Sequence, residues 1–219
     1  AYLEGARSLC DQNGTLLIFD EIMCGFRNDI RGTGAKLGIK ADLATFGKAI
    51  ANGYVIAALV GRRDLLSMLA PSGPVFYSGT FNGHPLSVAA ALTTLTILER
   101  DRVTDTLQQL TKRLSDGINQ AIGECGVSAV CQYFGSVWCL YFDVQEVKNS
   151  IDLGRSTTPR ADQLNDTFRL WMRERGVYIH RRHMLRGFVG AAHQESDIDR
   201  TVDLVRLFLK EHVNELKPA

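Results

Sequence analysis

The stretch LLIFD, residues 16–20, decides which fold the sequence predicts. An apolar run that ends on a carboxylate indicates a buried strand with a charge just beyond it. The stretch ADLATFGK, residues 41–48, repeats this arrangement with a lysine at its end. In an open α/β sheet, ligands bind outside the carboxyl ends of the parallel strands. The two stretches therefore predict that Asp20 and Lys48 point into one crevice.

Strand and helix patterns alternate through the first part of the chain. An amphipathic opening segment stops at Asn13-Gly14, and Pro85 opens a long apolar helix to about Arg100. Between them we expect strands at 15–19, 43–46 and 54–60 and a short helix at 62–69. Such alternation favours an α/β fold with a mostly parallel sheet, so residues 1–100 are predicted to form part of a large domain.

The second part of the chain has a different pattern. Apolar residues at spacings of three and four predict a helix from Val103 to Ile122. After it we expect strands at 127–133 and 136–142, a loop at 145–159, a helix at 163–175, and strands at 177–180 and 188–192. Ser196 and Asp199 fit a capping box at the start of a final helix. We predict a small α+β domain over residues 101–219, with a mainly antiparallel sheet.

Composition excludes several functional classes. The 219 residues are 45% hydrophobic and 22% charged, with a net charge of +1, which argues against a nucleic-acid partner. Five cysteines without a CxxC pair predict reduced thiols and a cytoplasmic protein. No apolar run approaches the roughly 20 residues that span a bilayer, so no membrane partner is expected. The first residues lack the features of a signal peptide, and the chain is expected to begin inside a larger fold.

Asp20 and Lys48 together predict an enzyme that uses pyridoxal 5'-phosphate (PLP). The lysine forms a Schiff base with the cofactor aldehyde, and the acid keeps the pyridine nitrogen protonated. Each residue alone has a plainer interpretation, because Asp after a strand is a common cap and most lysines are solvated. The apolar strand before Lys48 and the small residues after it predict a partly desolvated lysine.

A third element precedes the helix that Pro85 opens. Hydroxyls and loop amides at Ser78-Gly79-Thr80 form a natural phosphate cradle, although a plain turn and helix cap would use the same residues. His180 and His183 lie three residues apart without an acidic partner, so we predict no metal site.

Three segments together resemble the class III PLP-dependent aminotransferases of fold type I. They are LLIFDEIMCGFR at 16–27, DLATFGKAIANG at 42–53 and SGTFNGHPLSVAAAL at 78–92. Within that class the chain looks most like the glutamate-1-semialdehyde 2,1-aminomutase branch. The spacings from Asp20 to Lys48 and from Lys48 to Thr80 agree with that branch without gaps. The resemblance continues through GVYIH, FVGAAH and ESDIDRTV, and it covers the C-terminal half of the family proteins only.

The resemblance implies roles for individual residues. It implies that Asp20 contacts the pyridine nitrogen of the cofactor and that Lys48 binds the cofactor aldehyde. Ile22 would pack against one face of the cofactor ring, and Thr80 would contact the cofactor phosphate of the partner subunit in a homodimer. The family's own phosphate loop and its stacked aromatic residue belong to the half that this chain does not match.

One departure from the aminomutase branch concerns the substrate. The branch has an acidic residue at the position of Leu185, and Arg186 follows it here. An arginine near a substrate entrance can bind a carboxylate in a bidentate manner, although an exposed turn residue is the plainer interpretation. The absence of this acidic residue argues against the mutase reaction and agrees better with ordinary amino transfer.

Three functions therefore stay in competition. The first is PLP-dependent amino transfer from Lys48 to and from an amino acid or amino-aldehyde. The second is the intramolecular amino transfer of the aminomutase in tetrapyrrole biosynthesis. The third, of another class, is a non-catalytic fragment or the interface half of a split or truncated enzyme, with exposed apolar faces that favour association.

Overall fold

The computed structural model describes residues 2–155, 157–180 and 185–217. The chain divides into two compact units, Ala1–Asp105 and Thr106–Ala219, and each is considered by itself. Their assignment to the large and small domains of a longer enzyme stays a prediction. Among the described residues, no helix combines the length and the apolar character needed to cross a membrane.

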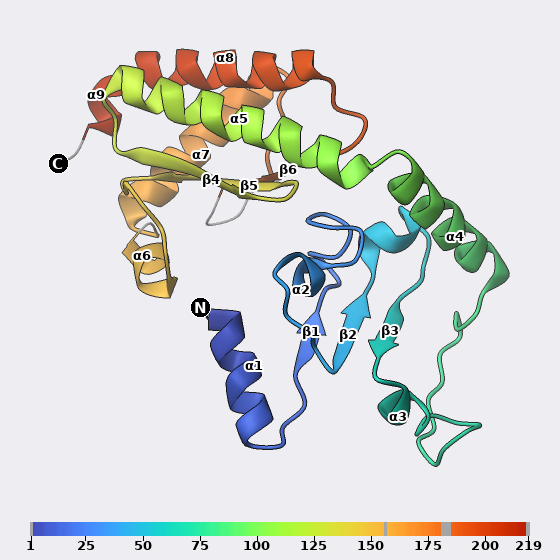
Figure 1. Cartoon of the computed structure of the whole chain (residues 1–219). Helices are drawn as coiled ribbons and strands as arrows, with labels where there is room; N and C mark the ends of the chain where they lie inside the picture. The colour runs from blue at the N-terminus through green and yellow to red at the C-terminus, as the bar shows by residue number, and fades with distance from the viewer. Residues whose placement is uncertain (1, 156, 181–184, 218–219) are drawn as a thin grey trace. The chain divides into compact units, whose positions relative to one another are not determined.

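The first unit is built on a three-stranded sheet with the order β1-β2-β3 (Figure 1). Strand β1 (Ile18–Asp20) runs parallel to β2 (Leu43–Phe46), whereas β3 (Ala58–Gly61) pairs with β2 in the antiparallel direction. The prediction of a mostly parallel sheet is therefore wrong for this chain. A short connection joins β2 to β3 on neighbouring positions, and a chain that turns back without a long crossover must pair antiparallel.

Helices and a 3-10 turn connect or flank these strands. They are α1 (Tyr2–Gln12), α2 (Thr33–Lys36), the 3-10 turn η1 (Lys48–Ala51), α3 (Arg63–Leu66) and α4 (Pro85–Arg100). As predicted, Pro85 occupies the first turn of α4, where its missing N–H costs no hydrogen bond. Asp20 is the last residue of β1 rather than the first residue beyond it.

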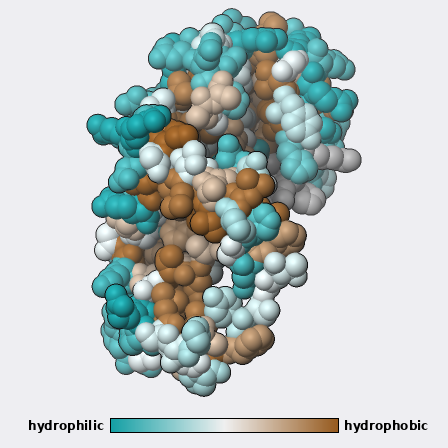
Figure 2. Space-filling model, turned by 90° about the vertical axis from the view of Figure 1, so that its right-hand side faces the viewer, coloured by the Kyte–Doolittle hydropathy of each residue, from teal (hydrophilic) through white to brown (hydrophobic). Residues whose placement is uncertain are grey.

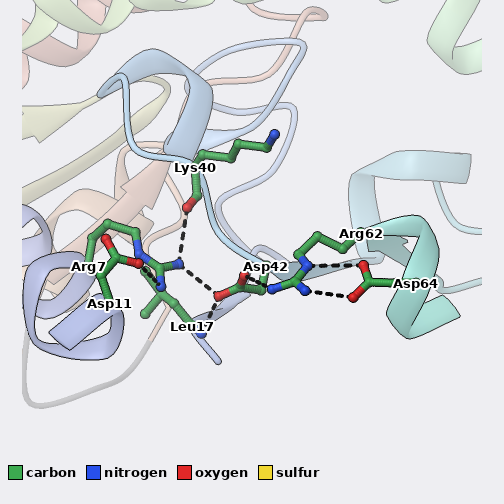
Figure 3. A network of polar contacts seen from close by, with 7 residues as sticks. All are labelled: Arg7, Asp11, Leu17, Lys40, Asp42, Arg62 and Asp64. Carbon is green, nitrogen blue, oxygen red and sulfur yellow. Dashed lines mark hydrogen bonds and ion pairs between the residues drawn. The ribbon is translucent and has the colours of Figure 1, made fainter. Parts of the chain in front are cut away.

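A network of charged side chains joins α1 to the residues that directly precede β2 and follow β3 (Figure 3). The Asp42 carboxylate accepts hydrogen bonds from the Leu17 N–H (2.8 Å), from Arg7 Nη1 (2.8 Å) and from Arg62 Nη1 (3.0 Å). Arg62 also pairs with Asp64. The Leu17 N–H, followed by the two guanidinium groups, holds the pKa of Asp42 far below its usual range.

The two faces of the first sheet differ. One face packs a small core of Phe46, Ile50, Ala51 and Ala91. The opposite face carries Ile18, Asp20, Leu43, Thr45 and Leu59, as the strand register requires. Ile18 and Leu59 on this face are 55% and 45% exposed. Figure 2 shows how much hydrophobic surface (brown) the chain leaves open to solvent.

The second unit is an antiparallel sheet with the order β4-β5-β6, covered on one face by helices. Its strands are β4 (Ala129–Phe134), β5 (Val137–Phe142) and β6 (Leu185–Phe188), and its helices are α5 (Val103–Cys125, which begins in the first unit), α6 (Ser150–Arg155), α7 (Pro159–Glu174), α8 (Glu195–Glu211) and α9 (Val213–Leu216). Figure 1 shows α5 and α8 side by side, and Arg113 of α5 forms an ion pair with Asp199 of α8.

Aromatic residues form the core of this unit. Phe208 is fully buried, and its ring lies 4.9 Å from that of Phe168 and 5.6 Å from that of Trp171, measured between centroids. Along β5, buried residues alternate with half-buried ones, so one face of the sheet meets this core.

Several boundaries of the second unit differ from the sequence-based predictions. Helix α6 interrupts the predicted loop at 145–159, and no strand forms at 177–180. Strand β6 ends at Phe188, where the predicted strand was to begin. Helix α8 begins two residues earlier than predicted, because Gln194 and Asp197 form the capping box in place of Ser196 and Asp199.

Candidate active site

The register of β1 and β2 brings Asp20 and Lys48 to the same edge of the sheet. Asp20 pairs directly with Thr45, and the Glu21 N–H donates to the Thr45 carbonyl at 2.9 Å. Strand β2 ends at Phe46, so Lys48 begins η1 just past the carboxyl end of the neighbouring parallel strand. Both residues are exposed. The two residues thus lie at one edge of a mixed sheet, and the crevice that both were expected to face stays a prediction.

The carboxylate of Asp20 is held on one side only. Its Oδ1 accepts hydrogen bonds from the Ile22 backbone N–H at 3.0 Å and from Thr45 Oγ1 at 3.5 Å. Among the described residues, no donor is bonded to Oδ2. This leaves one oxygen able to accept a hydrogen bond from a protonated ring nitrogen.

Lys48 has an unusual backbone conformation for a residue with a side chain. Its φ is +47°, in the left-handed region that residues other than glycine seldom adopt. Conformations of this kind are found disproportionately at active sites, where the surrounding structure holds them in place. Among the described residues, the Lys48 amine forms no hydrogen bond or ion pair, and the side chain is exposed. The expectation that the strand and the small residues of this chain desolvate it is therefore wrong.

Ile22 and Gly47 lie against each other beside the lysine. A Cβ built on Gly47 would stand 3.3 Å from Ile22 Cγ2, closer than an ordinary van der Waals contact. Glycine at this position lets the half-buried Ile22 side chain approach the backbone that precedes Lys48. The predicted contact of Ile22 with a cofactor ring stays a prediction.

Glu21 anchors the loop that follows Asp20. The side chain is 3% exposed, and its Oε1 accepts a hydrogen bond from the Gly34 N–H at 2.9 Å. This bond ties the end of β1 to α2. Behind the loop, a hollow of about 330 Å³ is lined by Phe19, Ala44 and Val60 among others, on the face opposite Asp20. It contains neither Asp20 nor Lys48.

The other predicted residues lie elsewhere. Thr80 is exposed and begins the turn that precedes α4, and no described contact joins it to Asp20 or Lys48. Leu185 is buried in the second unit at 1% exposure. Arg186 lies on β6 opposite Cys139, with its guanidinium 5.7 Å from the Phe188 ring centroid. His183 lies outside the described residues, and among those described no group of three or more His, Cys, Asp and Glu could hold a metal ion.

Sequence reasoning did not single out Thr45. A threonine in a strand is ordinary, and only the register shows that this one faces Asp20. The stretches LLIFD and ADLATFGK do not by themselves show which of their residues pair, so the sequence offered no signal for Thr45.

The positions of Asp20 and Lys48 at the ends of neighbouring parallel strands agree with what the resemblance to PLP-dependent enzymes of fold type I implies, and their roles toward the cofactor stay a prediction. The chain belongs to the class III aminotransferases, whose sequence profile matches residues 1–202. This family uses PLP as its cofactor.

Solved structures of the same fold align with almost the whole chain. A beta-phenylalanine aminotransferase from Variovorax paradoxus is 28% identical with a TM-score of 0.85, and the alignment covers 100% of this chain and 49% of that one. For an omega-transaminase from Sphaerobacter thermophilus the identity is 25%, the TM-score 0.85 and the coverage 95% and 47%. A glutamate-1-semialdehyde aminomutase from Pseudomonas aeruginosa PAO1 shares the fold at 20% identity and a TM-score of 0.80, over 95% of this chain and 47% of that one.

Two conclusions follow from these comparisons. The chain spans just under half the length of these three proteins. The aminomutase branch is not favoured over the transaminases, since the aminomutase is the least similar of the three in sequence.

Proposed function

We propose that this chain supplies the lysine and the carboxylate of PLP-dependent amino-group transfer, acting on an amino acid or amino-aldehyde. The observation that carries the proposal is the parallel register that pairs Asp20 with Thr45 and places Lys48 just past the end of β2. Neither residue is engaged in an ion pair among the described residues, so both remain available to a ligand.

The residues present fit two ends of the cofactor. When bound, PLP supplies an electron sink for the carbanion formed at the substrate carbon. The unbonded Oδ2 of Asp20 would accept a hydrogen bond from the ring nitrogen and favour its protonated form. The Nζ of Lys48 would bind the aldehyde carbon and, once released, move a proton between two carbons. Ile22 would pack on the ring.

Two further parts of the proposal involve a partner subunit and the half of the family proteins that this chain does not match. Thr80 would contact the phosphate of a cofactor bound to the partner subunit of a homodimer. The exposed position of Thr80 is compatible with such a contact. In the longer family proteins, the half that this chain does not match would cover the open sheet face that carries Ile18 and Leu59.

Ordinary amino transfer is favoured over the mutase reaction. The aminomutase branch, as the sequence resemblance implies, uses an acidic residue where this chain has Leu185. That side chain is fully buried and apolar here, so it supplies no charge to a substrate. The mutase reaction therefore stands as the second candidate, and the role of Arg186 in substrate binding is left to experiment.

The third candidate, a non-catalytic fragment, is separated from the first by cofactor binding. The test is the absorption spectrum of the chain with added PLP, followed by borohydride reduction and mass mapping of the labelled peptide. We expect a pH-dependent band of lysine-bound cofactor and a label on Lys48. Lys48→Ala should abolish both signals.

Lys40→Ala is the matched control. Lys40 is an exposed lysine of the same unit, and Figure 3 shows its side chain pointing away from the Asp42 network. Its removal should leave the band and the label unchanged. A spectrum of free cofactor, or labelling spread equally over lysines, would mean that the 219-residue chain alone is not a PLP enzyme.

A further inference from the structure

Thr45 faces the carboxylate that the proposed function assigns to the cofactor ring. We infer that Thr45 is a positioning residue, which orients Asp20 so that one of its oxygens is presented to the protonated ring nitrogen. The inference rests on the proposed function and concerns a residue that touches the reacting groups only through Asp20.

The strand register creates the contact. Asp20 and Thr45 are direct partners in the parallel pair β1–β2, and their side chains therefore lie on the same face of the sheet. The Thr45 hydroxyl donates to Asp20 Oδ1 across 3.5 Å, and the Ile22 N–H donates to the same oxygen across 3.0 Å. Two donors from different segments thus converge on one oxygen, and no donor in the described part of the chain is bonded to Oδ2.

The two donors differ in what holds them. The Ile22 N–H belongs to the turn that directly follows Asp20, so it moves with the carboxylate. Thr45 lies in the central strand, which has β1 on one side and β3 on the other. It is half-buried, and a β-branched side chain has few accessible χ1 rotamers. Asp20 is by contrast the exposed last residue of a three-residue edge strand. Thr45 is therefore the contact that ties Asp20 to the best-supported strand.

The hydrogen bond from Thr45 favours binding of the cofactor. A hydroxyl donor stabilises the ionised form of a carboxylate, and this form accepts a hydrogen bond from a protonated ring nitrogen. With Oδ1 occupied, rotation of the carboxylate is restricted, and Oδ2 is presented in one direction. Without the hydroxyl, only the local turn restrains the side chain.

A purely structural role would have different consequences. Polar cross-strand partners stabilise a sheet, and a residue with only that role would affect folding and not cofactor affinity. Valine has nearly the shape of threonine and a high strand propensity, so Thr45→Val removes the hydroxyl while the strand is kept. Thr45→Ser restores a hydroxyl. Thr96→Val, on the exposed face of α4, is the matched control, since the Thr96 hydroxyl donates only to the Leu92 carbonyl.

Two measurements on the 219-residue chain test the inference. The first is the dissociation constant for PLP. Thr45→Val should weaken binding about fivefold, as expected for the loss of a hydrogen bond worth ~1 kcal/mol, with Thr45→Ser and Thr96→Val close to wild type. In an Asp20→Ala background, Thr45→Val should have no further effect, because the hydroxyl then has no carboxylate to orient.

The second measurement needs no cofactor. Three-bond NMR couplings across χ1 of Asp20 should indicate one rotamer in the wild-type chain and averaged rotamers in Thr45→Val. Unchanged PLP affinity in Thr45→Val, or an equal loss in the Asp20→Ala background, would overturn the inference while the proposed function stands. If the wild-type chain binds no PLP, the proposed function fails for this chain, and unchanged couplings in Thr45→Val would then overturn the positioning role by themselves.

Discussion

Gly25→Ala is expected to disrupt the packing directly behind the candidate site. Gly25 is a buried residue of the loop that follows Asp20. A Cβ at this position would stand 2.5 Å from Phe46 Cδ1 and 2.7 Å from the Glu21 carbonyl oxygen. Ordinary contacts begin at 3.4 Å, so both neighbours would have to move by most of an ångström.

The cost follows from what these neighbours do. Phe46 is a central member of the small core of the first unit, and its ring packs at 5.1 Å from that of Phe26. The Glu21 carbonyl belongs to backbone that β2 and α2 hold in place. Overpacking of this kind costs about 1–3 kcal/mol. Because the displaced backbone begins at Asp20, PLP affinity should fall together with stability.

Hydrogen exchange measured by mass spectrometry is the suitable assay for this variant. Both tryptophans of the chain, Trp138 and Trp171, belong to the second unit, so their fluorescence reports on that unit and serves as an internal reference. We expect faster exchange in peptides from β2 and η1 and an unchanged fluorescence transition. Gly5→Ala is the control, because a Cβ in that helical position meets nothing within 4 Å.

A second substitution tests whether Gly25 packs on Phe46. Phe46→Leu removes ring atoms at the point of overlap, so it should offset part of the loss of stability caused by Gly25→Ala. The double variant should then be less destabilised than the two single effects added together. Full additivity, or a Gly25→Ala chain as stable as Gly5→Ala, would show that the loop does not pack on Phe46 as described.

Two further predictions concern stability. Phe208→Ala should destabilise the second unit by about 3–5 kcal/mol, since it empties the centre of the cluster with Phe168 and Trp171. Urea unfolding followed by tryptophan fluorescence measures this loss of stability. A loss below ~1 kcal/mol would contradict the packing. Asp42 has a lowered pKa, so its contribution to stability is present above the unfolded-state pKa of about 4 and is lost as the pH falls further. Asp42→Asn should therefore lower the stability of the first unit at pH 7 and reduce the dependence of that stability on pH below about 4. Hydrogen exchange measures both effects. An unchanged dependence of stability on pH would count against the network with Arg7.

Much of the local structure could be read from the sequence alone. Strand β2 has the predicted bounds Leu43–Phe46, and α4 spans Pro85–Arg100 as expected. The three- and four-residue spacing of apolar side chains predicted α5, and the strand expected at 136–142 corresponds to β5 (Val137–Phe142). These features depend on neighbours along the chain, which the sequence displays directly.

Boundaries that depend on a choice between similar local signals were less predictable. The start of α8 contains two pairs of residues with the spacing of a capping box, and the structure uses Gln194 with Asp197. The apolar residues of β3 did not indicate its direction, but the short connection from Phe46 to Ala58 favours an antiparallel pair, and the prediction of a mostly parallel sheet did not take it into account.

The sequence by itself predicted an acid and a lysine at the ends of two apolar strands, and its motifs indicated the class III aminotransferase family to which the chain belongs. Only the tertiary structure decided which residues face each other there. The pairing of Asp20 with Thr45 follows from hydrogen bonds between strands that are distant in the chain. The left-handed backbone of Lys48 and the close approach of Ile22 to Gly47 likewise arise from the loops that meet at this edge. A shift of one residue in register would turn every side chain of β1 to the other face, and no local pattern specifies that register uniquely.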